Sequence, residues 1–146
     1  MMPSKTDNPW GTCQVCGGKF LLIRGHVDQH GYQRVGDGWM LAACHGAYQQ
    51  PYEQSCDALP RYLTHLASQL ETRQEHRLRI ETGQGSLFYG YPCPAARRFK
   101  PGAPRYADIQ HERLAAMTAE VKAILLEIDR ANQRLMAWQP GGKATA

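Results

Sequence analysis

Two cysteines separated by two residues constrain the fold of this chain more than any other feature. Cys13 and Cys16 lie in the run Cys13-Gln14-Val15-Cys16-Gly17-Gly18-Lys19. Such a pair, followed by glycine and a basic residue, forms a tight turn whose backbone amides point at both sulfurs. This turn is the usual half of a structural zinc site. Zinc takes four tetrahedral ligands, so two more ligands are expected downstream.

The two further ligands are predicted to be His30 and Cys44, in the pattern Cys-x2-Cys-x13-His-x13-Cys. His30 precedes a Gly-Tyr turn that can aim the imidazole, and Cys44 follows a candidate strand. Thiolates and one imidazole are typical ligands of zinc, which has no redox chemistry of its own. Three alternatives stay open, namely Cys56, which would make a four-cysteine site, His26, and His45, which is very close to Cys44.

Short strands and many turns are expected around these ligands. Residues 12–57 are rich in glycine, and β-favouring pieces at 20–23 and 39–41 predict short antiparallel strands. The sequence therefore predicts a small zinc-ribbon module, preceded by a flexible leader at residues 1–11.

After residue 57 the spacing of the hydrophobic residues changes to that of a helix. Leu59, Leu63, Leu66 and Leu70 follow at alternating spacings of four and three, which predicts a helix over 57–80 with Asp57 as its cap. An irregular basic loop is expected at about 84–104, where a hairpin or an extended loop fits.

The last third of the chain gives the strongest helix signal. Its apolar residues recur at alternating spacings of three and four, which is a heptad seam. We expect this helix to fold back on the first one as an antiparallel, coiled-coil-like hairpin over 58–139, with a flexible tail at 140–146. The same seam suits a homodimer, and the sequence leaves both arrangements open. The seam residues are Leu114, Met117, Val121, Ile124, Ile128, Ala131, Leu135 and Trp138.

Positive charge is concentrated in the middle of the chain. Residues 59–105 carry eight Lys or Arg against three Asp or Glu, whereas the chain as a whole has a net charge of +4. Arginines bind phosphates, and the aromatic residues of the same segment could stack on bases. The same arginines could instead be exposed to solvent or paired with nearby glutamates. Both explanations, phosphate binding and a solvated surface, stay open. The predicted binding residues are Arg73, Arg77, Arg97, Arg98, Lys100 and Arg105.

One family resemblance rests on the ribbon segment. With Cys13, Cys16-Gly17, His30-Gly31-Tyr32 and Cys44 at these positions, residues 12–57 resemble small zinc-ribbon-type proteins of phages and mobile elements. The resemblance implies a metal site at Cys13, Cys16, His30 and Cys44. It implies no particular activity.

The predicted fold class is therefore α+β, and the predicted function is binding without catalysis. A zinc-stabilised protein that associates with nucleic acid, or with a complex that handles it, is the first hypothesis. A phage or mobile-element adaptor that binds a host defence protein through its helices is the second, and a zinc hydrolase is a distant third. No catalytic residue and no small-molecule substrate are expected. The chain has no apolar run long enough for a membrane span and no signal peptide, so a cytoplasmic location is expected.

Overall fold

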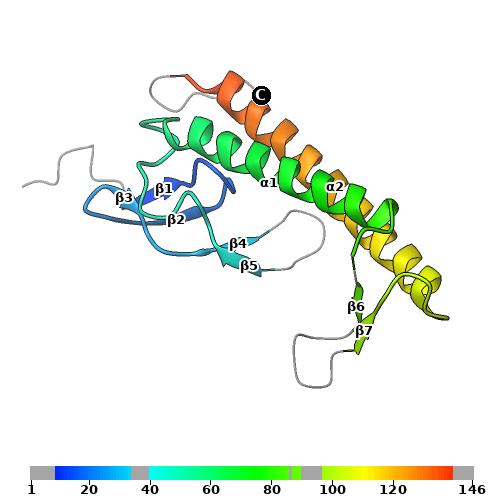
Figure 1. Ribbon diagram of the computed structural model, residues 1–146. Coiled ribbons are helices and arrows are strands. Elements are labelled where there is room, and N and C mark those ends of the chain that lie inside the picture. The colour runs from blue at the N-terminus through cyan, green and yellow to red at the C-terminus, as the bar shows by residue number, and fades with distance from the viewer. Residues whose placement is uncertain (1–8, 34–39, 86, 90–96, 140–146) are drawn as a thin grey trace, which may run out of the picture. The chain divides into compact units, whose positions relative to one another are not determined.

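The computed structural model describes residues 9–33, 40–85, 87–89 and 97–139. Short antiparallel strands come first and two helices follow, which confirms the predicted α+β class (Figure 1). Within the described ranges, the elements in chain order are β1 (Trp10–Thr12), β2 (Lys19–Ile23), β3 (His26–Val27), β4 (Gly31–Gln33), β5 (Met40–Ala43), α1 (Ala58–Glu81), β6 (Leu87–Tyr89), β7 (Arg97–Phe99) and α2 (Tyr106–Ala137).

The chain divides into two compact units. The first is Met1–His65 with Ile128–Ala146, and the second is Leu66–Glu127. Each unit therefore contains part of α1 and part of α2. The segments expected from the sequence (1–11, 12–57, 58–139 and 140–146) were defined by expected strands and helices. This division of the chain stays a prediction. Residues 1–8 of the predicted leader and the whole predicted tail at 140–146 lie outside the described residues.

In the first unit, β1, β2 and β3 form an antiparallel sheet with β2 in the middle. The side chains of β2 alternate between exposed and half-buried, as expected for a strand with one covered face. On the covered side Val27 is fully buried. A Cβ atom at Gly11 would lie 2.6 Å from the Cβ of Pro51, so the close approach of the Pro51 ring to this strand requires a glycine.

The strands β4 and β5 form a second, two-stranded antiparallel sheet. His30 directly precedes β4 and Cys44 directly follows β5, and the Cys44 N–H donates to the His30 carbonyl at 2.9 Å. This pairing brings together two residues that are far apart in sequence. The strand expected at 39–41 is found as β5, and its residue 39 lies outside the described residues.

The loop between β5 and α1 is tied to β1 by one carboxylate. Glu53 accepts hydrogen bonds from the backbone N–H and the hydroxyl of Thr12, and the Tyr52 N–H donates to the Thr12 carbonyl at 2.8 Å. Burial alone would raise the pKa of the Glu53 carboxyl, but the hydrogen bonds from Thr12 outweigh burial and the pKa is lowered. Glu53 is thus held as a carboxylate against the sheet.

In the second unit, α1 ends at a glycine in the left-handed conformation. Gly83 has φ +68°, its N–H donates to the Ile80 carbonyl at 3.2 Å, and the Gln84 N–H donates to the Arg79 carbonyl at 3.0 Å. This pair of bonds is the Schellman motif, which satisfies the last carbonyls of a helix. The side chain of Gln110 on α2 adds a bond to the Ile80 carbonyl at 2.7 Å.

Of the two alternatives for residues 84–104, the structure contains a short hairpin. β6 and β7 pair antiparallel, and residues 86 and 90–96 lie outside the described residues. The end of α1, the hairpin and the start of α2 share one apolar core. Its buried members are Ile80, Leu87, Tyr106, Ile109 and Met117.

Within this second unit, α1 and α2 run side by side in opposite directions (Figure 1). The Arg73 guanidinium lies 3.3 Å from the Glu120 carboxylate across them, and both side chains are about half exposed. All eight seam positions are buried or half-buried, with Trp138 just beyond the end of α2. Coiled-coil geometry and dimerisation stay predictions.

No helix in the described ranges is both long enough and apolar enough to cross a membrane.

Candidate metal centre

Three sulfurs and one imidazole nitrogen converge in the first unit. Cys13 and Cys16 come from the turn between β1 and β2, His30 from the residue before β4, and Cys44 from the residue after β5. Their ligand atoms all lie within 4.8 Å of one another. The structure thus brings together the four residues that the sequence pattern selected, in a group that could hold a metal ion.

The turn from Cys13 to Gly18 is closed by its own backbone. The Cys13 N–H donates to the Gly18 carbonyl at 2.8 Å, and the Gly17 N–H donates to the Cys13 carbonyl at 3.1 Å. The Val15 N–H points at the Cys13 sulfur, at 3.4 Å. At Gly46 a Cβ atom would lie 2.1 Å from that same sulfur, so the residue opposite the turn must be glycine. We call residues 13–18 the knuckle.

Two of the distances between the ligand atoms match those of a tetrahedral zinc site, and all four ligand atoms lie within 4.8 Å of one another. Tetrahedral zinc with Zn–S bonds of about 2.3 Å places two sulfurs about 3.8 Å apart, and a sulfur and a nitrogen about 3.5 Å apart. The Sγ atoms of Cys13 and Cys44 are 3.8 Å apart, and Cys16 Sγ lies 3.4 Å from His30 Nε2. Since a disulfide would need about 2.05 Å, these cysteines are free thiols arranged as a ligand set.

The imidazole of His30 is oriented by two neighbours. Its Nδ1 lies 2.8 Å from the Asp28 carbonyl, which can only accept, so Nδ1 carries the proton and Nε2 keeps its lone pair. The Phe20 ring stacks on the imidazole with centroids 3.7 Å apart and planes 16° apart. The nitrogen that faces the sulfurs is therefore the one able to bind a metal.

The three thiols do not ionise equally. Hydrogen bonds from the Cys13 and Cys44 thiols lower the pKa of the Cys16 thiol to about 2. The pKa of Cys13 and that of Cys44 are raised, first because their protons are held in hydrogen bonds to neighbouring sulfurs, and also because of burial. A divalent cation would supply the positive charge that three thiolates need and would displace the remaining protons.

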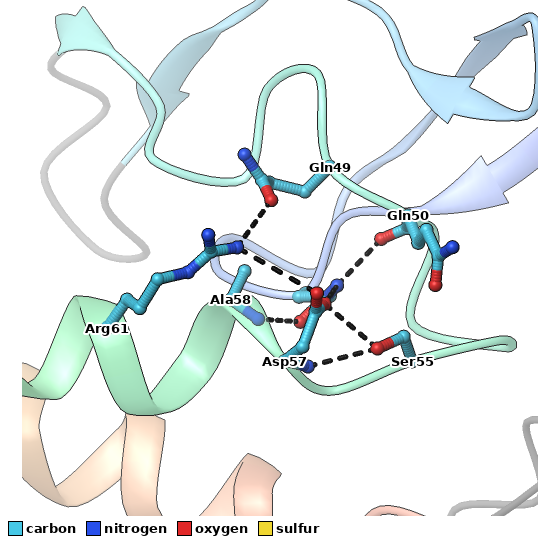
Figure 2. Close-up of polar contacts among 7 residues, drawn as sticks. Gln49, Gln50, Ser55, Asp57, Ala58 and Arg61 are labelled. Atoms are coloured by element: carbon cyan, nitrogen blue, oxygen red, sulfur yellow. Dashed lines mark hydrogen bonds and ion pairs between the residues drawn. The ribbon is translucent and has the colours of Figure 1, made fainter.

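A side chain of the knuckle also caps the first residue of α1. Gln14 lies between the two cysteines and is fully buried. Its Oε1 accepts a bond from the N–H of Ala58, the first residue of α1, at 2.8 Å, and its Nε2 donates to the Gln50 carbonyl and to Asp57 Oδ1. Figure 2 shows these polar contacts around the start of α1. Gln14 and then Ser55 lower the pKa of Asp57 by hydrogen bonding, and its negative charge stands at the positive end of the helix. The first turn of α1 is thus capped from the knuckle, 44 positions away.

The last turns of the second helix are bound to the same knuckle. The Arg134 guanidinium donates from Nε to the Gln14 carbonyl at 2.9 Å and from Nη2 to the Cys13 carbonyl at 3.1 Å. A Cβ atom at Gly17, where φ is +75°, would lie 2.7 Å from Arg134 Nη1. Two parallel donors of one rigid group therefore hold α2 against the backbone of the metal-binding turn.

Tyr52 supports this contact from the other side. Its hydroxyl donates to the Arg134 carbonyl, its ring lies under the Arg134 guanidinium at 4.9 Å, and its own carbonyl accepts from the Trp138 indole N–H at 2.6 Å. Burial raises the pKa of the Tyr52 hydroxyl, which keeps its proton available as a donor. The end of α2 is thereby fixed at three points in the first unit.

The alternative ligands lie outside this group. Cys56 is half-buried but is not part of the cluster found among the described residues. His26 is exposed and contacts the Arg24 carbonyl through Nδ1 at 3.0 Å. His45 contacts His65, with ring centroids 4.4 Å apart, and burial followed by the charge of His65 lowers its pKa.

The predicted binding residues belong to the second unit, and their settings differ. Arg73 pairs with Glu120, and the Arg105 guanidinium lies 5.9 Å from the Phe99 ring. Arg77 is half-buried, whereas the side chains of Arg98 and Lys100 are exposed. The side chain of Arg97 lies outside the described part of the structure.

The sequence analysis missed four residues that support this site, namely Gln14, Phe20, Tyr52 and Arg134. For Gln14 and Arg134 the only signal is position, since Gln14 lies inside the Cys-x2-Cys pair and Arg134 lies beside the seam. Neither signal specifies a backbone partner.

Comparisons of the chain with protein-family models, with curated proteins and with solved structures found no significant match. The fold and the site define a small α+β protein with a Cys3His group that could hold a metal ion.

Replacing Cys44 by serine is expected to abolish metal binding, because a hydroxyl is a far weaker ligand than a thiolate. Replacing Cys56 by serine is the matched control and is expected to leave one metal ion per chain. Elemental analysis of the purified variants, and the visible absorption of cobalt(II) bound to thiolates, measure both. Metal loss in Cys56→Ser with retention in Cys44→Ser would contradict the assignment.

Replacing Arg134 by glutamine is expected to destabilise the metal-loaded protein by about 2 kcal/mol, because two bonds from a charged donor to the knuckle are lost. The exposed Lys122, on the same helix, is the control, and Lys122→Gln is expected to change the free energy of unfolding by less than about 0.5 kcal/mol. Urea denaturation of both variants measures the difference. Equal effects would show that the Arg134 contact contributes little.

Proposed function

We propose that Cys13, Cys16, His30 and Cys44 hold a structural zinc ion and that the protein is a binding protein without catalytic activity. The observation that carries this proposal is the pair of contacts from the knuckle to the two helices, through Gln14 to Ala58 and through the knuckle carbonyls to Arg134. A metal ion that shapes the knuckle therefore also positions both helix ends.

The donor set supports zinc over the other common ions. Thiolates exclude magnesium and calcium, which take oxygen ligands, and a tetrahedral arrangement of three sulfurs and one nitrogen is typical of structural zinc. The raised pKa of the Cys13 thiol and that of Cys44 imply that binding releases protons.

A structural role is favoured over hydrolysis because four protein ligands leave no position for water. Glu53, the only glutamate in the ribbon segment, is bonded to Thr12 and has a lowered pKa, which makes it a weak base. These two features argue against the third hypothesis.

Nucleic acid is the partner that the charge distribution favours. The eight Lys or Arg of residues 59–105 include the exposed side chains of Arg98 and Lys100, next to the aromatic residue Phe99. Charged groups of this kind bind phosphates without regard to sequence. The Arg73–Glu120 ion pair shows that part of the positive charge is neutralised within the chain.

A protein partner is the second candidate, as in an adaptor of a phage or mobile element. The observation in its favour is a set of exposed aliphatic side chains on the helices. These are Leu78, Leu125 and Leu126. A partner held by such residues would give a complex that tolerates salt, unlike a phosphate complex.

Binding of a fluorescein-labelled oligonucleotide, followed by anisotropy, tests the first candidate. The affinity is expected to fall steeply between about 50 and 200 mM salt. Changing Arg98 and Lys100 to alanine together is expected to reduce the slope of log K against log salt by about two.

Lys122→Ala with Arg130→Ala is the control of equal charge and is expected to change the slope by less. Absence of binding at low salt by the metal-loaded protein would refute the nucleic-acid proposal, and a salt-independent complex with a protein would support the adaptor instead.

A further inference from the structure

Two histidine side chains outside the Cys3His group meet on the surface of the first unit. His45 directly follows Cys44, and His65 lies on α1. Their rings are in contact, with centroids 4.4 Å apart and planes tilted by 42°. Both histidines are exposed, whereas Cys44 is buried among the other metal ligands. The imidazole of His45 therefore belongs to a different group from the sulfur of its neighbour.

The backbone holds both histidines on ordered elements. The Ala47 N–H donates to the Cys44 carbonyl at 3.0 Å, which closes the turn that contains His45. His65 lies within a helix of 24 residues. Tyr62, three residues before His65, is buried, and its ring centroid lies 5.2 Å from that of His45. The two imidazoles are thus presented by rigid segments, which favours a ligand site over a chance encounter of mobile side chains.

The distance between the two rings suits two imidazoles bound to one ion. With a metal–nitrogen bond of about 2.1 Å, two rings bound about 90° apart at an octahedral ion have centroids about 4.6 Å apart. The observed 4.4 Å is close to this value, and the tilt shows that the rings are not stacked face to face. Because both residues are exposed, small rotations of the side chains can point one nitrogen of each at a common ion.

The chemistry of the pair selects a class of ion. Imidazole nitrogens suit zinc, nickel and copper, whereas magnesium and calcium take oxygen ligands. In the part of the chain that the structure describes, the Cys3His group is the only set of three or more close potential ligands, so this pair supplies two ligands by itself. The nearby cation Arg61, one turn before His65, is held by Gln49 at 2.7 Å and by Asp57 at 3.9 Å (Figure 2).

We propose that His45 and His65 form a second metal site, which binds a divalent transition-metal ion such as nickel(II) or zinc through one nitrogen of each ring. Water takes the remaining positions. The second site is therefore open to exchange, unlike the Cys3His group, in which four protein ligands close the coordination sphere. This inference does not rest on the proposed nucleic-acid function.

Titration of nickel(II) into the zinc-loaded full chain without a histidine tag, followed by calorimetry, tests the second site. His65→Ala and His45→Ala are each expected to weaken nickel binding by at least about tenfold, because one imidazole alone lacks the intramolecular second contact. The double variant is expected to bind no more weakly than either single variant, since each single change already removes the chelate. His76→Ala, an exposed histidine on the same helix, is the control and is expected to stay within about twofold of the wild type.

A second measurement locates the ion. Nickel(II) is paramagnetic, so at low occupancy it is expected to broaden the imidazole NMR signals of His45 and His65 before those of His76 and His111. Zinc content and thermal melting of each variant are expected to match the wild type, because neither histidine belongs to the Cys3His group.

Three results would overturn the inference. The first is a wild-type protein that binds no nickel up to about 1 mM once the Cys3His group is filled. The second is equal nickel affinity in the wild type and both single variants, or an equal loss in His76→Ala, since the ion would then bind to scattered surface histidines. The third is loss of the structural zinc in His65→Ala, which would show that the pair serves the first site.

Discussion

The backbone and side chains of the knuckle hold the ends of both helices, and the first unit depends on this contact. Gln14 caps Ala58 at the start of α1, and the carbonyls of Cys13 and Gln14 accept from Arg134 near the end of α2. Each bond needs the turn in one conformation, which four ligand atoms around one ion would fix. In this account the metal stabilises the sheet and the helix ends together, so its binding free energy is folding free energy.

The candidate metal ligands do not include the exposed cations proposed to bind a partner. The ligand atoms lie between the knuckle and the residues flanking β4 and β5, and Phe20 covers the imidazole of His30. Two of those cations, Arg98 and Lys100, are exposed on either side of Phe99 in the second unit. We therefore propose that a metal ion bound by this group stabilises the fold and that partners bind to exposed side chains outside it.

The ligand set and the helices were predictable because local spacing encodes them. The pattern from Cys13 to Cys44 selected the four residues that the structure brings together, and the period of apolar residues located α1 and α2. The contacts of Gln14 and Arg134 were not predictable, because they cross 44 and 120 positions and a polar side chain carries no sequence signal for the backbone that it reaches. Strand register behaves in the same way, so the residues that lie opposite each other across β1, β2 and β3 become known only when the strands are paired.

Hydrogen–deuterium exchange of the zinc-loaded protein, before and after removal of the metal with a strong chelator, tests the central claim most directly. Loss of the ion is expected to increase exchange in the knuckle, in the first turn of α1 from Ala58, and in the last turns of α2 around Arg134. Peptides covering residues 109–117, in the core of the second unit, serve as the internal reference and are expected to change least. Unchanged protection of both helix ends in the metal-free protein would contradict the claim that the metal centre holds them.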